Sequence, residues 1–347
     1  MSEQWLVTGA SGFLGYHMCR HLVDRGIGVR GVDIAAFDYP DLVSDVQFTQ
    51  GDVRDAELMG KLMQGVRVVV HGAAALPLAS IDEIHSTNVD GTRVVLEEAA
   101  KCGCERVVFI SSTSVYGIPE THPVDEAYPL VGVGPYGESK IEAESVCGEF
   151  SEKGLCVPVL RPKSFAGPKR LGVFQILCEW VDEGRNVPIV GNGRNRYQLL
   201  HVADLAEAIL LAGTAPADVA NDVFNIGATD FATMRDGLQS LLDYAGHGKR
   251  VVGIPSWLVI PTLKLLERLH LSPLYEWIYE TADKDHYVSV EKAQQVLGWQ
   301  PRCSTADVWI DTYKWYVSEA ADMPIGTGVS HRVAWKQGML RLVKLFF

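Results

Sequence analysis

Tyr136 and Lys140 are the two residues whose types and spacing point most directly to chemistry. They lie in the segment Tyr136-Gly137-Glu138-Ser139-Lys140, which opens a predicted helix. A separation of four residues places both side chains on one helix face. An ammonium group beside a phenol favours the phenolate form. Tyr136 can therefore act as a general base towards an alcohol and as a general acid towards a ketone.

A run of hydroxyl residues from Ser111 to Ser114 follows a predicted strand and supplies a third group. Ser112 can hold a substrate oxygen by a hydrogen bond, and Thr113 is a less favoured candidate for the same role. A tyrosine and a lysine four residues apart also occur by chance on helix surfaces. Their significance therefore depends on the elements that position them.

The amino-terminal stretch Trp5–Gly15 is typical of a buried strand, a glycine turn and the start of a helix. A tight turn needs residues that tolerate positive φ, and a pyrophosphate binds to backbone N–H groups at the positive end of a helix. A second predicted strand, Val29–Asp33, closes a βαβ unit, which favours a dinucleotide site over an ordinary tight turn. The predicted cofactor-binding residues of this loop are Gly9, Ser11, Gly12, Phe13, Leu14 and Gly15.

Acidic and small residues follow the next strands. Asp33 lies 18 residues after Gly15, where a carboxylate can accept both ribose hydroxyls of NAD and would repel the 2′-phosphate of NADP. NAD is therefore the predicted cofactor. Asp52, beside Val53, can bind the adenine amino group, whereas Asp55 is predicted to cap a helix. Small residues after the fourth strand allow a cofactor to lie there, or a helix to pack closely: Gly72, Ala73 and Ala74.

Strand and helix patterns alternate through the first half of the chain. Valine-rich apolar runs are typical of strands covered on both faces, and right-handed crossovers between them predict a Rossmann-type, doubly wound parallel α/β sheet. The predicted strands are Trp5–Thr8, Val29–Asp33, Val46–Gln50, Val66–His71, Arg106–Ser111 and Cys156–Arg161. The predicted helices between them are Phe13–Arg25, Ala56–Gln64, Ile81–Lys101 and Tyr136–Lys153.

The pattern loosens after Pro162 and predicts a smaller, interleaved substrate lobe. The expected NAD-binding domain covers residues 1–165 and is completed by about 201–228. The lobe covers 166–200 and 229–329, and includes a strand-like segment at His286–Ser289. Residues 330–347 form a basic, apolar tail. Such a tail can lie in a membrane interface, or dock as a helix on its own protein or on a partner subunit.

Composition excludes several classes of protein. A net charge of −12 over 347 residues argues against a general nucleic-acid binder. The seven cysteines show no metal-ligand spacing, so no metal is predicted. Their odd number and the lack of a signal peptide predict reduced thiols in a cytoplasmic protein, with membrane association limited to the tail. No apolar run is long enough to span a bilayer.

Taken together, these motifs resemble those of extended short-chain dehydrogenases/reductases of the NAD-dependent epimerase/dehydratase group, over residues 4 to about 320. The resemblance rests on Thr8–Gly15, Gly51–Val53, Asn88–Thr92, the serine strand end, Tyr136–Lys140 and Gly167-Pro168. It implies that Tyr136 is the acid/base, that Lys140 binds the nicotinamide ribose and that Ser112 is the third catalytic residue. Further cofactor contacts are implied at Ser111, Asn88 and Pro162.

The resemblance also implies a homodimer, because such enzymes usually pair through a four-helix bundle. The helices in this chain would be Ile81–Lys101 and Tyr136–Lys153.

The match is weaker where substrate should bind. Nucleotide-sugar members usually carry an asparagine three residues after the strand-end arginine, where this chain has Ser164. Tyr197 stands where an arginine often occurs, and Arg194 and Arg196 can serve a diphosphate instead. The segment 191–196 also resembles a loop of 3β-hydroxysteroid-dehydrogenase-type members. Three basic residues can form a rim that binds an anionic substrate: Lys163, Lys169 and Arg170. The alternative is that they are solvent-exposed charges of a loop.

Three hypotheses follow for the function. The first is a nucleotide-sugar epimerase or dehydratase, in which Tyr136 removes the hydroxyl proton and the carbinol hydride passes to the nicotinamide. The second is a 3β-hydroxysteroid-dehydrogenase-like dehydrogenase or reductase of a lipid-like alcohol. The third, a non-catalytic NAD-binding scaffold, is disfavoured by the intact set of Ser112, Tyr136 and Lys140.

Overall fold

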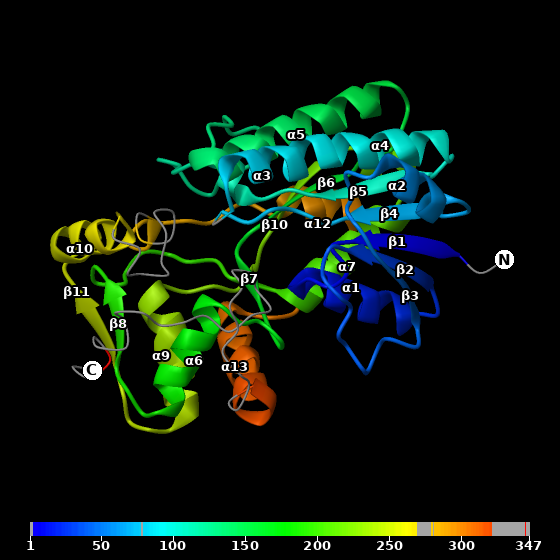
Figure 1. The fold of residues 1–347 in the computed structure, drawn as a ribbon. Coiled ribbons are helices and arrows are strands. Elements are labelled where there is room, and N and C mark those ends of the chain that lie inside the picture. The colour runs from blue at the N-terminus through cyan, green and yellow to red at the C-terminus, as the bar shows by residue number, and fades with distance from the viewer. Residues whose placement is uncertain (1–2, 78, 269–278, 280, 321–343, 345–347) are drawn as a thin grey trace.

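The computed structural model describes residues 3–77, 79–268, 279, 281–320 and 344. A seven-stranded parallel sheet lies at the centre, in the order β10-β6-β5-β4-β1-β2-β3 (Figure 1). The strand order reverses between β1 and β4, and ligands of such sheets bind at this switch point, beyond the carboxyl ends of the strands. The strands are β1 (Gln4–Thr8), β2 (Gly28–Asp33), β3 (Val46–Gln50), β4 (Val68–His71), β5 (Arg106–Ile110), β6 (Val159–Pro162) and β10 (Val223–Ile226).

Helices cover both faces of this sheet (Figure 1). Side chains alternate along β1, so that Trp5 and Val7 join one hydrophobic core and Leu6 joins the other. The predicted doubly wound α/β fold is therefore confirmed. Packed on the Trp5 side are α1 (Phe13–Val23), α7 (Val202–Thr214) and α12 (Glu291–Leu297). Packed on the Leu6 side are α2 (Ala56–Met63), α4 (Gly91–Lys101) and α5 (Gly134–Glu152).

The predicted helix 81–101 is not a single regular α-helix. It consists of α3 (Ile81–His85), a π-helical segment η1 (Ser86–Asp90) and α4. At the junction of η1 and α4, the Thr92 hydroxyl donates to the carbonyl of Asn88, at 2.6 Å. Such π-helical turns are common at functional sites, and this one turns the side chain of Asn88 towards the end of β4.

The remaining segments form a lobe beside the carboxyl edge of the sheet (Figure 1). Its core includes Cys178, Leu241 and Trp309, buried among three helices. The predicted strand at His286–Ser289 is wrong, because this segment makes only isolated bridges, to Tyr197 and Val124. The lobe and its connections comprise η2 (Thr113–Tyr116), β7 (Phe165–Ala166), α6 (Val173–Asp182), β8 (Val187–Val190), β9 (Leu200–His201), α8 (Ala217–Ala220), α9 (Met234–Ala245), β11 (Val251–Ile254), α10 (Ser256–Arg268), α13 (Thr305–Trp315) and η3 (Tyr316–Ala320).

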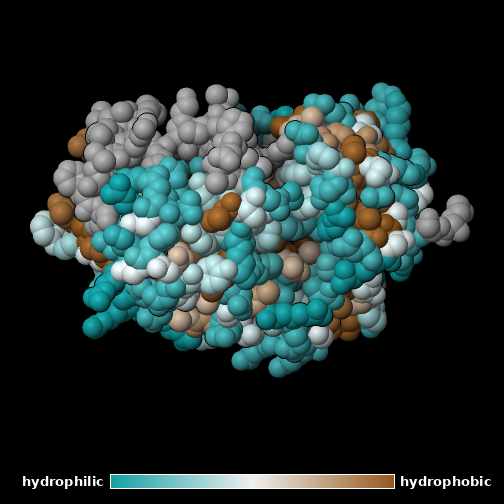
Figure 2. Space-filling view, turned by 90° about the horizontal axis from the view of Figure 1, so that it is seen from below, coloured by the Kyte–Doolittle hydropathy of each residue, from teal (hydrophilic) through white to brown (hydrophobic). Residues whose placement is uncertain are grey.

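The basic tail at 330–347 lies outside the described residues except at Lys344. The Lys344 ammonium lies 3.0 Å from a carboxylate oxygen of Glu179 and also binds Glu183, so this one residue is docked on α6. Within the described part of the chain, no helix combines the length and the apolar character needed to cross a membrane. One face of the molecule carries mainly hydrophilic side chains, with hydrophobic ones in small separate areas (Figure 2).

Candidate active site

The turn between β1 and α1 brings two backbone segments very close together. Gly9 has φ +72°, and the amides of Gly9 and Ala10 both donate to the carbonyl of Val32, at 2.9 and 3.2 Å. A Cβ on Gly15 would lie 2.1 Å from the Gly9 carbonyl oxygen. Gly12 precedes α1 without a side-chain cap, and the first turn of α1 contains no acid. The first intrahelical donor of α1 is Tyr16, whose amide donates to the Gly12 carbonyl at 3.0 Å, so the amides from Phe13 to Gly15 can bind an anion, as a pyrophosphate requires.

The carboxylate of Asp33 is held at the end of β2 beside this loop. One oxygen accepts the backbone N–H of Ser11 at 3.0 Å, and the other accepts the N–H of Ala35 at 2.8 Å. These two bonds fix the carboxylate beside the glycine turn, where the predicted ribose would lie.

Asp52 forms an ion pair that the sequence did not predict. Its carboxylate pairs with the Arg54 guanidinium at 2.6 Å, and this pairing lowers the pKa of Asp52. A carboxylate can accept further hydrogen bonds, so the adenine contact of Asp52 stays a prediction. Val53 is buried in the core below, and Asp55 caps α2 by accepting the N–H of Leu58, as predicted.

A buried chain of hydrogen bonds supports the loop after β4. The Thr8 hydroxyl contacts Nδ1 of His71 at 2.8 Å and accepts the backbone N–H of Ala73 at 3.1 Å. The other ring nitrogen of His71 contacts the hydroxyl of Thr92 at 3.0 Å. Burial lowers the pKa of His71 to about 3, so this ring is neutral, and its hydrogen bonds have a structural role. The chain holds the small residues Gly72, Ala73 and Ala74 against β1.

Asn88 joins the same loop to the helix that carries Tyr136. Its side-chain oxygen accepts the N–H of Ala75 at 2.8 Å, and its side-chain nitrogen donates to the Ser139 hydroxyl at 3.0 Å. That hydroxyl in turn donates to the backbone carbonyl of Tyr136 at 2.9 Å. Asn88 therefore positions the start of α5 relative to the end of β4.

Lys140 and Tyr136 lie together, as their spacing predicts. The Lys140 ammonium is buried, donates to the carbonyl of Ile110 at 2.9 Å, and lies 6.0 Å from the centre of the Tyr136 ring. Burial lowers the pKa of Lys140 to about 8, so most of these amines are charged at pH 7. The lysine is anchored to the end of β5, next to the serine-rich segment.

The Ser112 hydroxyl caps η2 by accepting the N–H of Ser114 at 3.1 Å, and it keeps its own proton for donation. Thr113 is buried. A Cβ on Gly137 would lie 3.0 Å from the Ser114 carbonyl oxygen. The glycine thus lets the first turn of α5 lie directly against η2, beside Ser112.

Glu144 belongs to a buried network that the sequence analysis missed. Its carboxylate accepts the Ser111 hydroxyl and two guanidinium nitrogens of Arg161, the closer at 2.5 Å. Arg161 also donates to the Tyr116 hydroxyl at 2.9 Å, and this hydroxyl donates to Asn225 at 2.7 Å. The signal was present in the sequence, because residues 136, 140 and 144 recur every four positions on one helix face.

The predicted substrate residues do not form one charged cluster. Arg194 is exposed, and the Arg196 guanidinium lies over the rings of Phe231 and Tyr287, 4.7 and 4.5 Å from their centres. Ser164 is exposed and follows β6. Burial raises the pKa of Tyr197. A hydrogen bond between the side chains of Tyr197 and Ser164 partly offsets this rise.

The predicted basic rim is also wrong for two of its three members. Lys163 and Arg170 are 2% and 9% exposed, and only Lys169 is partly open to solvent. The Arg170 guanidinium lies about 5 Å above the rings of Phe13 and Phe174. Packing against the lobe has buried charges that a loop sequence alone would leave in solvent.

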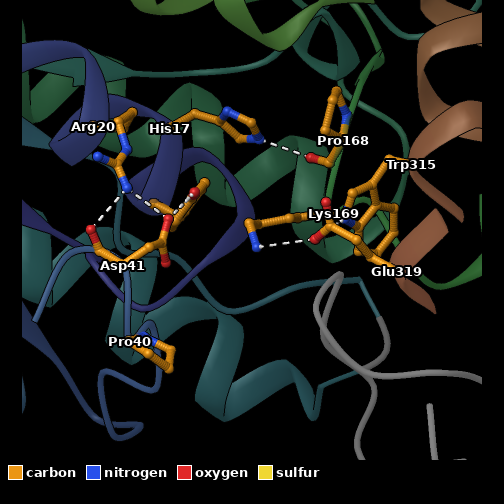
Figure 3. A pocket seen from close by; sticks show the side chains of 9 residues that line it. His17, Arg20, Pro40, Asp41, Pro168, Lys169, Trp315 and Glu319 are labelled. Atoms are coloured by element: carbon orange, nitrogen blue, oxygen red, sulfur yellow. Dashed lines mark hydrogen bonds and ion pairs between the residues drawn. The ribbon is translucent and has the colours of Figure 1, made fainter. Parts of the chain in front are cut away.

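A separate groove of about 550 Å³ lies between α1 and the lobe (Figure 3). Tyr16 and Arg20 both bind the Asp41 carboxylate at 2.6 Å on one side, and Lys169 lies 3.9 Å from Glu319 on the other. These charges are already paired, and the groove is lined by α1 rather than by strand ends. It is therefore distinct from the Tyr136 site.

Comparisons with known proteins agree with this geometry. Residues 5–227 match the profile of the NAD dependent epimerase/dehydratase family. The chain belongs to this family. A relative in Sinorhizobium fredii, uncharacterized protein y4nG, is 34% identical over 342 residues, or 97% of this chain and 85% of the relative. The 3 beta-hydroxysteroid dehydrogenase/Delta 5-->4-isomerase of Mycobacterium tuberculosis is 28% identical and covers 90% of each chain.

Among solved structures, the UDP-glucose 4-epimerase of Thermotoga maritima, determined with UDP-glucose, is 26% identical. It aligns with a TM-score of 0.74 over 90% of this chain and 98% of its own. Family members are NAD-dependent epimerases, dehydratases and dehydrogenases, and similar structures contain NAD. This chain is therefore an NAD-dependent enzyme.

Proposed function

We propose that the protein oxidises a secondary alcohol, or reduces the matching ketone, with Tyr136 as the general acid/base. The position of the buried Lys140 ammonium beside the Tyr136 ring carries this proposal, because that charge favours the phenolate that removes the hydroxyl proton. Ser112 holds the reacting oxygen by donating its free proton. NAD, when bound, accepts and returns hydride.

The residues proposed to hold NAD surround the switch point of the sheet. The amides from Phe13 to Gly15 donate to the pyrophosphate, and Asp33 accepts ribose hydroxyls and repels a 2′-phosphate. Asn88 acts mainly by holding the loop after β4. The remaining proposed contacts are Gly9, Ser11, Gly72, Ala73, Ala74, Ser111, Lys140 and Pro162, with Asp52 and Val53 at the adenine end.

A nucleotide sugar is the first candidate substrate. Its support is the likeness to the Thermotoga maritima enzyme, which spans the lobe as well as the sheet. In an epimerase, the ketone turns over in the site and takes the hydride back on its other face. In a dehydratase, the ketone allows loss of water from a neighbouring carbon.

A lipid-like alcohol is the second candidate, favoured by the state of Arg196. Its guanidinium lies over two aromatic rings, those of Phe231 and Tyr287, and is thus engaged by the protein itself. Tyr197 also replaces an arginine that nucleotide-sugar members often carry. The relative from Mycobacterium tuberculosis bears the name of a hydroxysteroid dehydrogenase, which agrees with this alternative.

A homodimer is proposed through α4 and α5, which lie side by side on one face of the sheet (Figure 1). Arg93 on α4 pairs with Glu149 on α5 at 2.9 Å, so an ion pair joins the outer faces of the two helices. Analytical ultracentrifugation of the full chain tests this directly, and a monomer at micromolar concentration contradicts it.

Native mass spectrometry of the purified full chain, followed by turnover assays, tests the proposed function. Retained NAD with a nucleotide sugar supports the first candidate, and a bound lipid-like alcohol supports the second. Tyr136→Phe should retain NAD and lose turnover of whichever substrate is found. Turnover equal to that of the unaltered enzyme would refute the role of Tyr136.

A further inference from the structure

Lys163 is a buried amine at the carboxyl edge of the sheet that the proposed chemistry does not use. It follows Pro162, the last residue of β6, and its backbone N–H donates to the carbonyl of Ile226 at the end of β10, at 2.8 Å. Its side chain is among the largest fully buried ones of the described residues. The ammonium therefore lies where the sheet meets the lobe, the region in which ligands of such folds bind.

Among the described residues, the neighbours of this amine include no carboxylate that would balance its charge. Its nitrogen contacts Nδ1 of His286 and lies 5.9 Å from the centre of the Tyr197 ring. In the described part of the chain, no acidic oxygen lies within 4.0 Å of it. Burial, and to a smaller extent the charges of Lys163 and His122, lower the pKa of His286 well below its usual value. A buried ammonium normally has an ionic partner, and since the described residues supply none, an anion bound here would stabilise the charged form of Lys163.

The remaining hydrogen-bonding capacity of Lys163 fits an oxyanion. An ammonium has three N–H donors, and the neutral His286 ring accepts one of them. The other two can bind the oxygens of one carboxylate or phosphate group. Ser164, the next residue, is exposed, so this site lies close to solvent.

The site is also within reach of the proposed reacting centre. Leu160 on β6 pairs with Ile110 on β5, and the Ile110 carbonyl binds the Lys140 ammonium. Lys163 lies three residues beyond Leu160, or about 10 Å along the strand direction. A small substrate can therefore contact Lys163 while its alcohol lies at Tyr136.

We propose that Lys163 binds an anionic group of the substrate, a carboxylate or a phosphate, at the same edge of the sheet as the catalytic pair. This inference rests on the proposed function and adds a substrate class, an alcohol or ketone that carries a negative charge. The neutral His286 ring orients the ammonium, and the ring of Tyr197 covers one side of it.

Binding to the NAD-loaded full chain tests this inference by titration calorimetry with two matched pairs of probes. The first pair is 3-hydroxydecanoate and its methyl ester, and the second is UDP-glucose and uridine. We expect the unaltered protein to prefer the anionic member of one pair by at least about tenfold, a difference of 1.4 kcal/mol. Preference within the first pair indicates a carboxylate, and within the second a phosphate.

Lys163→Met should abolish that preference and leave the neutral probe unaffected, whereas Lys163→Arg should retain most of it. Lys169→Met is the matched control and should change neither, because Lys169 is partly exposed and already lies near Glu319. If Lys163→Met retains the preference, or if the unaltered protein has none in either pair, the inference is wrong. Lys163→Gln provides a second neutral variant should Lys163→Met fail to fold.

The two proposals can fail separately. Turnover by Tyr136→Phe at the normal rate removes the proposed acid/base, but the binding preference and its dependence on Lys163 remain measurable. Conversely, loss of turnover in Tyr136→Phe together with equal binding of charged and neutral probes removes only the role of Lys163.

Discussion

The Lys140 ammonium lies 6.0 Å from the centre of the Tyr136 ring and is tied to the end of β5 through the Ile110 carbonyl. This relationship places a fixed positive charge beside a phenol at the carboxyl edge of the sheet. It links the strand that precedes the serine-rich segment to the helix that carries the proposed acid/base.

Removal of the Tyr136 hydroxyl is expected to abolish turnover. Tyr136→Phe should lower kcat by about 10²- to 10⁴-fold, the range for loss of a general acid/base, with NAD affinity retained. Steady-state kinetics and NAD titration measure the two quantities. Tyr244→Phe is the control, because Tyr244 is 51% exposed in the lobe and should behave as the unaltered enzyme. An active Tyr136→Phe enzyme would contradict the proposal.

Gly15→Ala should disrupt the amino-terminal turn. The added Cβ would lie 2.1 Å from the Gly9 carbonyl oxygen and 2.6 Å from Cα of Ala10, so the helix or the loop must move. We expect a loss of about 1–3 kcal/mol in the free energy of unfolding, with NAD affinity reduced at least tenfold.

Gly148→Ala is the matched control for this change. Gly148 lies inside α5, and a Cβ there would meet nothing within 4 Å. Alanine should stabilise that helix by up to about 1 kcal/mol without affecting NAD. Urea unfolding and NAD titration compare the pair, and equal behaviour of the two variants would refute the steric argument.

The fold and the centre of the site were predictable because local spacing determines them. Glycines three residues apart after a buried strand determine the turn at Gly9–Gly15, and a separation of four residues places Tyr136 and Lys140 together. Asn88 was identified only through resemblance, because the π-helical turn that orients it has no simple sequence pattern.

The lobe was harder to predict because its contacts join distant segments. Lys163 contacts His286, 123 residues away, so its own neighbourhood, with Lys169 and Arg170, falsely predicted an exposed basic rim. Glu144 and Arg161 pair across 17 residues. Burial of such charges depends on tertiary packing, which cannot be predicted from the periodicity of hydrophobic residues.

Glu144→Gln should destabilise the protein strongly. The carboxylate and the Arg161 guanidinium are 7% and 5% exposed, so the substitution leaves a buried cation without its counter-ion. A loss of about 3–5 kcal/mol in unfolding free energy is expected. Glu149→Gln is the control on the same helix. Its pair with Arg93 is exposed and should contribute at most about 1 kcal/mol. Urea unfolding that shows equal effects would contradict this prediction.

Asp33→Asn should weaken NAD binding more than NADP binding. The carboxylate accepts the N–H of Ser11 with one oxygen and the N–H of Ala35 with the other, whereas the amide nitrogen of asparagine cannot accept. The neutral amide also no longer repels a 2′-phosphate. We expect NAD affinity to fall at least about tenfold, or 1.4 kcal/mol, and NADP affinity to change less. Fluorescence titration measures both. Exposed Asp45→Asn is the control, and equal losses for both cofactors would contradict the assignment of NAD.

Stability should rise with pH because of Lys163. Burial lowers its pKa from 10.5 to about 7, so between these values the unfolded chain binds more protons than the folded one. The contribution of Lys163 to the free energy of unfolding therefore increases by about 2 kcal/mol between pH 7 and pH 9. Lys163→Met lacks this increase, whereas Lys169→Met should retain it. Urea unfolding at both pH values gives the comparison. Parallel pH dependence in Lys163→Met and the unaltered protein would show that the amine keeps its ordinary pKa in the fold.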